Sequence, residues 1–120
     1  LYPGDTVAVA DALISTGAVK QANTLLRMGI KEAASLPIAG SLGRRWTEVY
    51  GYALLGEYDN ACKALAEAAD IGYFQNHTVL TVDPALAKLR QQPCFEKQYG
   101  RVSAMAEAQV SAARKAGLLP

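Results

Sequence analysis

The chain has 120 residues, 51% of them hydrophobic, and its 12 lysines and arginines against 11 aspartates and glutamates give a formal net charge of +1. This length suits one domain whose single hydrophobic core needs neither a metal nor a disulfide. No basic run extends beyond Arg44-Arg45, so direct nucleic-acid binding lacks an electrostatic basis. No stretch approaches the ~20 continuous apolar residues of a membrane span, and we expect no span in this chain.

The composition also indicates the fold class. Alanine and leucine are abundant, whereas aromatic residues make up only 8% of the chain. Aromatic and β-branched residues are too sparse to fill a sheet, and small, unbranched side chains suit closely packed helices. We therefore predict an all-α fold, with residues 1–120 forming a single domain.

A first helical hairpin is predicted over about 5–36. Its first helix begins near Asp5-Thr6, because either side chain can cap free backbone N–H groups, and it ends at Gly17. The second helix follows that glycine and carries an apolar stripe at helical spacing. Pro37 stops it, since proline cannot continue a helix.

A second hairpin is predicted over about 44–71. The segment 37–43 before it contains a proline, two glycines and a serine but no charged residue, which is typical of a connecting loop. From residue 44, apolar residues recur at three- and four-residue intervals until Gly56 ends the helix. A further helix follows and closes at Gly72.

Both hairpins carry one repeated pattern. Each copy has a glycine, then an alanine five positions later, a leucine nine positions later and a tiny residue twelve positions later. The copies are Gly17, Ala22, Leu26 and Gly29, and Gly56, Ala61, Leu65 and Ala68. A repeated helix–turn–helix unit with a small-large-small stripe is typical of a stacked helical scaffold. The repeat therefore favours a binding module over an enzyme.

The last third of the chain departs from the repeat, and we predict a capping segment over about 74–117. Asp83 and Pro84 begin a helix there, with the aspartate as N-cap and the proline at the first helical position. A final helix begins near Pro93 and ends at Gly117. Its apolar stripe comprises Phe95, Tyr99, Val102, Met105, Ala106, Val110 and Ala113. Because a solenoid end must cover its core, we expect this helix to act as the C-terminal cap.

The repeat resembles the tetratricopeptide family, in which a small residue of the first helix packs against an alanine of the second. The second hairpin matches best, through Tyr52, Gly56, Ala61, Leu65 and Ala68. The repeated glycines are 39 residues apart instead of the family's 34, and the loop 37–43 can hold the extra residues. The resemblance implies an α-solenoid of helical hairpins.

A narrower likeness involves the segments 51–61, 83–90 and 93–95. The run Asp-Pro-x-Leu-x-x-Leu-Arg-x-x-Pro-x-Phe that begins at Asp83 is similar to the C-terminal region of certain bacterial signalling proteins. Those chains begin with a winged-helix DNA-binding domain, an adenylate cyclase domain or a protein kinase. The likeness implies a non-catalytic regulatory module from the C-terminal part of a longer chain. Its compartment, cytoplasmic or periplasmic, would depend on the upstream region.

The candidate partner-binding residues are Arg45, Trp46 and Tyr50. The two aromatic residues lie one helical turn apart, on the helix that lines the concave groove in tetratricopeptide arrays. They could anchor a peptide there, with Arg45 as a donor for a partner carboxylate and Asp11 and Ser15 completing the surface. Core packing of the aromatic pair is the alternative. The partner would be a peptide, another domain of the same chain or a second copy of the chain.

A small-ligand sensor and an enzyme are the alternatives to a protein-binding module. A small-ligand sensor would use a pocket between the hairpins around Trp46, Tyr50 and Tyr52. An enzyme is disfavoured because His77, the sole histidine, has no partner group in the sequence around it and the acidic residues spread over outer helix faces. There is no phosphate-binding loop motif. We therefore predict no catalytic residue, metal or cofactor.

Cys62 and Cys94 are 32 residues apart, which fits neither a redox pair nor a zinc-binding motif. We interpret them as two buried, unpaired thiols, because free cysteine commonly behaves as a small hydrophobic residue. The alternative is a disulfide that ties the second hairpin to the terminal helix, which would indicate an oxidising compartment.

Overall fold

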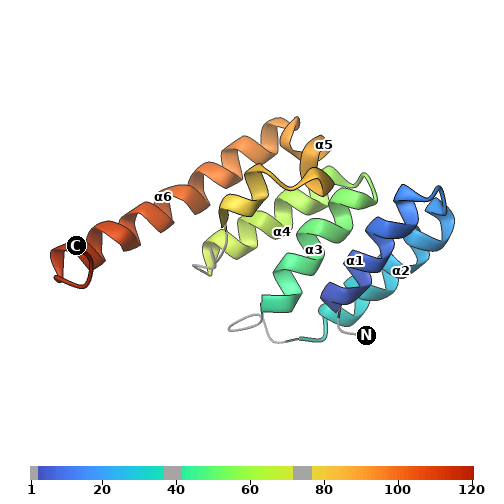
Figure 1. The fold of residues 1–120 in the computed structure, drawn as a ribbon, viewed down its shortest axis with the longest axis horizontal. Helices are drawn as coiled ribbons and strands as arrows, with labels where there is room; N and C mark the ends of the chain where they lie inside the picture. The colour runs from blue at the N-terminus through green and yellow to red at the C-terminus, as the bar shows by residue number, and fades with distance from the viewer. Residues whose placement is uncertain (1–2, 37–41, 72–76) are drawn as a thin grey trace.

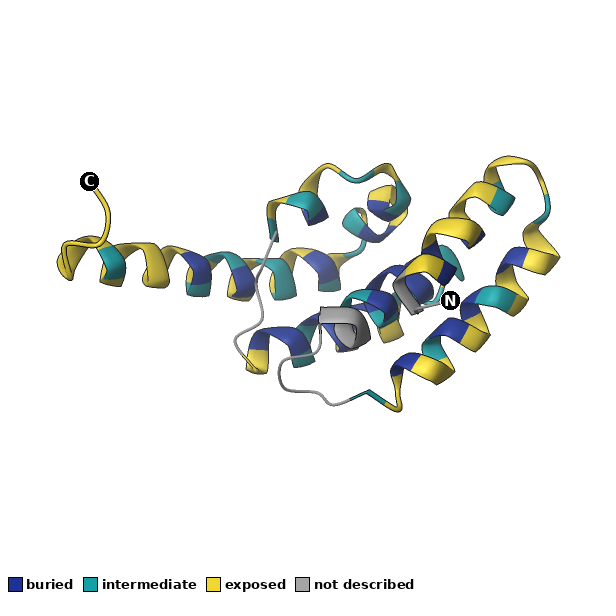
Figure 2. Cartoon of the chain, turned by 60° about the horizontal axis from the view of Figure 1, so that its bottom comes forward, coloured by how far each residue is buried: buried dark blue, intermediate teal, exposed yellow. Residues whose placement is uncertain are grey.

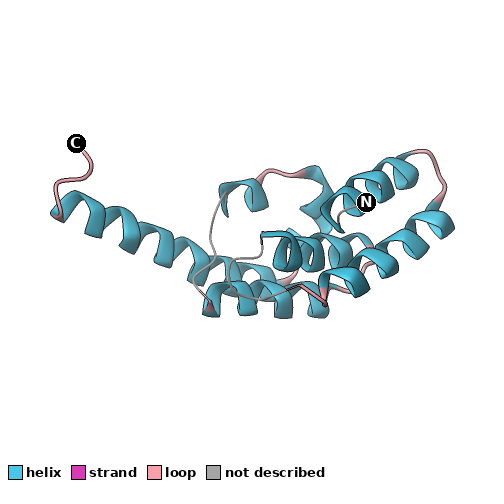
Figure 3. Ribbon diagram, turned by 90° about the horizontal axis from the view of Figure 1, so that it is seen from below, coloured by secondary structure: helices cyan, strands magenta, loops and turns pink. Residues whose placement is uncertain are grey.

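A computed structural model of the chain describes residues 3–36, 42–71 and 77–120. Every regular element in these ranges is a helix (Figure 3), which confirms the predicted all-α class. The helices are α1 (Pro3–Ser15), α2 (Val19–Ala33), α3 (Leu42–Leu54), α4 (Tyr58–Asp70), the short 3₁₀ helices η1 (His77–Thr81) and η2 (Pro84–Leu86), α5 (Ala87–Arg90) and α6 (Pro93–Lys115). Pro37 and Gly72, the predicted stop signals, lie outside the described residues.

The first four helices form two hairpins that stack side by side. Helix α1 packs against α2, and α3 packs against α4 (Figure 1). Helix α3 also contacts both helices of the first hairpin. Helices α1 and α2 thus form one hairpin and α3 and α4 a second, and the first helices of the two, α1 and α3, are neighbours.

The turns of both hairpins are built in the same way around Gly17 and Gly56. These glycines have positive φ angles of 86° and 79°, a left-handed conformation that strains any residue with a Cβ atom. In each turn the glycine N–H donates to a carbonyl three residues back, and the next N–H donates to one five residues back. This double hydrogen bond is the Schellman motif, which satisfies carbonyls at a helix C-terminus. The same turn gives both hairpins the same register.

The repeat positions that follow these glycines all lie in the core. Ala22 and Ala61 have no exposed surface, and Leu26 and Leu65 are 1% and 3% exposed. The hairpins also approach each other closely at Gly51 of α3, which is buried. A Cβ atom there would lie 2.9 Å from Cγ1 of Ile30 on α2. Small residues therefore allow α2 and α4 to pack closely into the core, and they allow the two hairpins to approach each other.

The C-terminal third closes the same core. Helix η2 packs on α3, and α6 packs on α4 (Figure 1). Leu80, Leu86, Leu89, Phe95 and Val102 are buried in one cluster with the core residues of the hairpins. As predicted, Asp83 caps η2 through its side chain, and proline occupies the first turn. The segment is thus an integral part of the fold.

Cys62 of α4 and Cys94 of α6 form a disulfide with a Cα–Cα distance of 6.0 Å. The interpretation of two unpaired thiols is therefore wrong, and the alternative pairing is correct. Farther along, Arg101 of α6 forms an ion pair with Asp70 at the end of α4. The two contacts show that α4 and α6 run parallel, which brings residues that are 31 and 32 positions apart into contact.

Only the first part of α6 caps the fold. Phe95, Val102 and Ala106 are buried, but Val110 is 43% exposed, and the last turns of the helix extend away from the body (Figures 1 and 2). The apolar stripe of α6 continues past the core, because α4 ends at Asp70, opposite Arg101. Among the described helices, none has the length and apolar character that crossing a bilayer requires.

Candidate functional site

A groove lies where α1, α3 and the segment 83–88 meet. Its smaller hollow, which we call the Trp46 pocket, has a volume of about 240 Å³. The pocket is lined by Val7, Ala8, Asp11, Trp46, Tyr50, Asp83 and Ala85. A larger hollow of about 520 Å³ is lined by residues within 11–15, 53–58 and 83–88. The two hollows share Asp11, Asp83 and Ala85, and together we call them the α1–α3 groove.

Helix α3 supplies the aromatic wall of the Trp46 pocket. Trp46 and Tyr50 lie one helical turn apart, so their side chains emerge on the same face. Their ring centroids are 4.8 Å apart, with the planes tilted by 33°. Tyr50 is buried, at 5% exposure, whereas Trp46 is only partly buried. Tyr50 thus belongs to the core, as the alternative interpretation held, while Trp46 also presents surface to the groove.

Asp83 joins the C-terminal segment to α3. Its Oδ1 accepts a hydrogen bond from the Ala85 N–H at 3.0 Å, and its Oδ2 accepts one from the Tyr50 hydroxyl at 2.6 Å. Burial raises the pKa of Tyr50 above its ordinary value of 10.0, and the hydrogen bond to Asp83 raises it further. The phenol therefore stays protonated and acts as a donor at neutral pH.

The position of Asp83 is held from the other side by Arg90 at the end of α5. The Arg90 Nη1 donates to the backbone oxygens of Leu80, at 3.1 Å, and of Asp83, at 2.7 Å. These charge-assisted bonds fix the backbone before η2. Asp83 is thus held through its carboxylate and its backbone oxygen, which leaves little freedom to its side chain.

The structure brings together most of the residues that the sequence proposed for partner binding. Trp46 and Tyr50 line the Trp46 pocket, and Asp11 and Ser15 line the groove. The side chain of Arg45 lies outside the described residues. Tyr52 does not line either hollow.

The sequence did not indicate the site role of Asp83, nor its contact with Tyr50. The two residues are 33 positions apart, and each has a local explanation as a helix cap or a core residue. Val7, Ala8 and Ala85 were also missed, because small apolar residues at helical spacing are the commonest pattern in any packed helix. Only the helix arrangement places them around one pocket.

Within the described part of the chain, no group of three or more His, Cys, Asp and Glu side chains is placed to hold a metal ion. His77 lies beside Tyr99 of α6, with ring centroids 6.2 Å apart, and does not line the groove. The two carboxylates of the Trp46 pocket have no histidine or thiol beside them. The site offers hydrogen bonds, negative charge and apolar surface.

Comparison of the chain with known proteins gave no match to a family model, a curated protein or a solved structure.

Proposed function

We propose that the chain is a non-catalytic protein–protein interaction module that binds a peptide, or an extended segment of another domain, in the α1–α3 groove. The observation that carries this proposal is the groove itself, which continues from the Trp46 pocket into a hollow of about 520 Å³. Its first wall includes the sole tryptophan of the chain, partly buried. Tryptophan at the centre of a concave surface is a frequent binding anchor.

A preformed groove supports binding with little rearrangement. Tyr50 and Arg90 fix Asp83 through hydrogen bonds, and the residues behind the groove belong to one core cluster. A rigid surface loses little conformational entropy when a partner docks, so more of the contact energy appears as affinity. This is the mechanism that we propose: recognition by a surface that exists before binding.

The proposed role in a bacterial signalling or regulatory protein rests on the tetratricopeptide-like repeat. Two stacked hairpins with the same glycine turn, and a groove lined by their first helices, are what such a repeat would produce. The module would then dock a peptide or another domain of its own chain. A second copy of the chain is a further partner of the same kind.

The groove favours a peptide over a small metabolite. The groove extends beyond a single pocket, because the Trp46 pocket of about 240 Å³ shares Asp11, Asp83 and Ala85 with the hollow of about 520 Å³. Tyr52, which a sensor pocket between the hairpins would use, does not line either hollow. A pocket that adjoins a larger hollow suits an extended chain that inserts one side chain.

The test is a selection from a random peptide library, with a blocked groove as the control. Ala8 is exposed and lines the Trp46 pocket, so Ala8→Phe fills the pocket without disturbing the core. Val9 on the same helix is 41% exposed and lines neither hollow, which makes Val9→Phe the matched control. We expect selected peptides to bind the wild type and Val9→Phe but not Ala8→Phe. Recovery of peptides that bind all three proteins equally would reject the groove as the binding site.

A further inference from the structure

We infer that the Trp46 pocket receives a lysine or arginine side chain of the docked segment. This inference rests on the proposed function and specifies the chemistry of the partner. The cationic group would lie between the carboxylates of Asp11 and Asp83, with the ring of Trp46 beside it. The partner is therefore a basic peptide segment.

The Trp46 pocket is lined by acidic side chains. The acidic side chains among its described lining residues are Asp11 and Asp83, and none of those described residues is a lysine or arginine. Asp11 is exposed, and its carboxylate has no hydrogen bond or ion pair with any residue that the structure describes. A carboxylate without a cation at the mouth of a concave site attracts a positive ligand.

Asp83 contributes charge in spite of its contacts. Each of its oxygens accepts one hydrogen bond, and a carboxylate oxygen has two lone pairs. Arg90 lies nearby but donates to backbone carbonyls and does not line the pocket. The guanidinium thus bonds the backbone oxygen of Asp83 and not its carboxylate.

The remaining walls match the other parts of a basic side chain. Val7, Ala8 and Ala85 offer a small apolar surface, against which the methylene stem of lysine or arginine can lie while its charged head reaches a carboxylate. The partly buried ring of Trp46 offers a π-face to the cation, and tryptophan is the strongest such partner among aromatic residues. Carboxylate and aromatic face together favour arginine, whose planar group can stack and donate at the same time.

The charges along the groove also favour one order of basic and acidic residues in the bound segment. Lys88 is exposed and lines the larger hollow, away from the Trp46 pocket. A basic residue in the pocket and an acidic residue toward Lys88 would complement both ends of the groove. The reverse order would place like charges together at both ends.

Defined peptides test the inference. The probe is acetyl-Ala-Ala-Arg-Ala-Ala-amide, compared with the same peptide carrying citrulline, which is neutral but nearly isosteric, in place of arginine. Trp46 fluorescence and amide NMR shifts report binding. We expect the arginine peptide to bind at least about fivefold more tightly than the citrulline peptide, since charge-assisted hydrogen bonds are about twice as strong as neutral ones. The difference should shrink as salt is raised.

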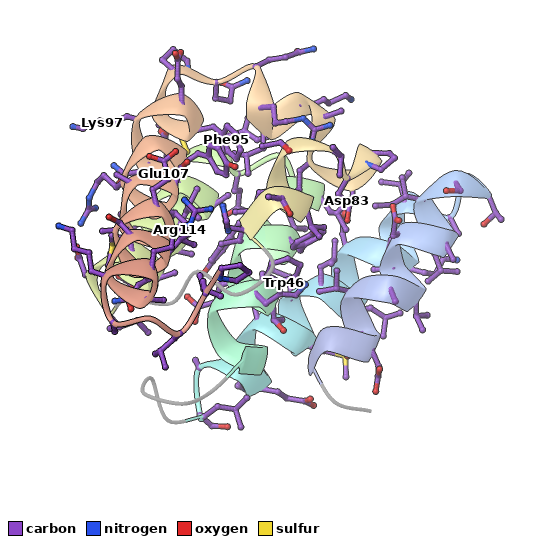
Figure 4. All side chains as sticks on the ribbon, turned by 60° about the vertical axis from the view of Figure 1, so that its left-hand side comes forward. Trp46, Asp83, Phe95, Lys97, Glu107 and Arg114 are labelled. Carbon is purple, nitrogen blue, oxygen red and sulfur yellow. A yellow bond between two sulfur atoms is a disulfide. The ribbon has the colours of Figure 1, made fainter. Side chains whose placement is uncertain are left out.

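Asp11→Asn locates the charge. This change should weaken the arginine peptide about fivefold, the upper range for a solvent-accessible ion pair, and leave the citrulline peptide unaffected. Glu107→Gln is the matched control, because Glu107 lies on α6, away from Trp46 and Asp83 (Figure 4), and changes the net charge equally. Equal binding of both peptides, or no effect of Asp11→Asn on the arginine peptide, would overturn the inference.

The library selection separates this inference from the proposed function. Groove-dependent peptides with a lysine or arginine at one fixed position support both. Groove-dependent peptides without a basic residue leave the proposed function standing and reject the basic side chain. If no groove-dependent peptide is recovered, the proposed function fails, and the inference fails with it.

Discussion

Removal of the Cys62–Cys94 disulfide should cost a large part of the stability of the fold. The bridge closes a loop across a sequence separation of 32 residues. In the chain-entropy treatment, a cross-link of this span destabilises the unfolded state by about 3.7 kcal/mol. A domain of this size has a free energy of unfolding of roughly 6–18 kcal/mol. The double variant Cys62→Ala with Cys94→Ala should therefore fold, but with much less stability.

Urea unfolding followed by circular dichroism measures this loss. With a urea dependence of about 1.5 kcal/mol/M, the midpoint should fall by about 2.5 M. A reductant should lower the midpoint of the wild type to a similar value and should not affect the double variant. If the double variant unfolds at the same urea concentration as the oxidised wild type, and reductant changes neither, the stabilising role of the α4–α6 bridge is refuted.

Four further substitutions test the packing. Tyr50→Phe should cost about 1.5 kcal/mol, because a hydrogen bond to a carboxylate is lost. Burial and the hydrogen bond to Asp83 raise the pKa of Tyr50 above 10.0 in the folded protein. The wild type should therefore lose stability as the pH rises above 10.0, because the phenol then ionises in the unfolded chain. Urea titrations at alkaline pH should show a weaker loss for Tyr50→Phe. Gly51→Ala should destabilise by about 1 kcal/mol, because its new Cβ meets Ile30 and overpacking outweighs the gain in helix propensity. Gly100→Ala, where no atom lies within 4 Å of the new Cβ, should instead stabilise by about 0.8 kcal/mol. Urea unfolding measures both variants, and equal effects of the two would contradict the close approach. Thr47→Val should stabilise by about 1 kcal/mol in urea unfolding, because the buried Thr47 hydroxyl has no hydrogen-bond partner in the described structure; a loss of stability would show that the hydroxyl is paired.

The hairpins could be predicted from the sequence because their causes are local. Gly17 and Gly56 are needed by the turn itself, and the alanine and leucine that follow lie at fixed helical spacing. The cap at Asp83 is equally local, since aspartate before proline starts a helix. In each case the cause of the local structure lies within one or two turns of the chain.

The missed features depend on how helices are placed relative to one another. Nothing near Cys62 or Cys94 indicates that α4 and α6 run parallel, and nothing near Val110 shows that α4 ends too early to cover it. The residues of the candidate site show the same difference between local causes and helix arrangement. Trp46 could be proposed from its type and spacing, whereas Asp83 became part of the pocket only through its contact with Tyr50.

The central claim is that a partner docks in the α1–α3 groove. The most direct measurement is an amide NMR titration of the isotope-labelled protein with the tightest peptide from the library selection. If a partner docks in the groove, the shifts should be confined to residues 7–15 of α1, to Trp46 including its indole N–H, to Tyr50, and to residues within 53–58 and 83–88. Shifts that instead follow the protruding end of α6, or the outer face of α2, with Trp46 unchanged, would contradict it.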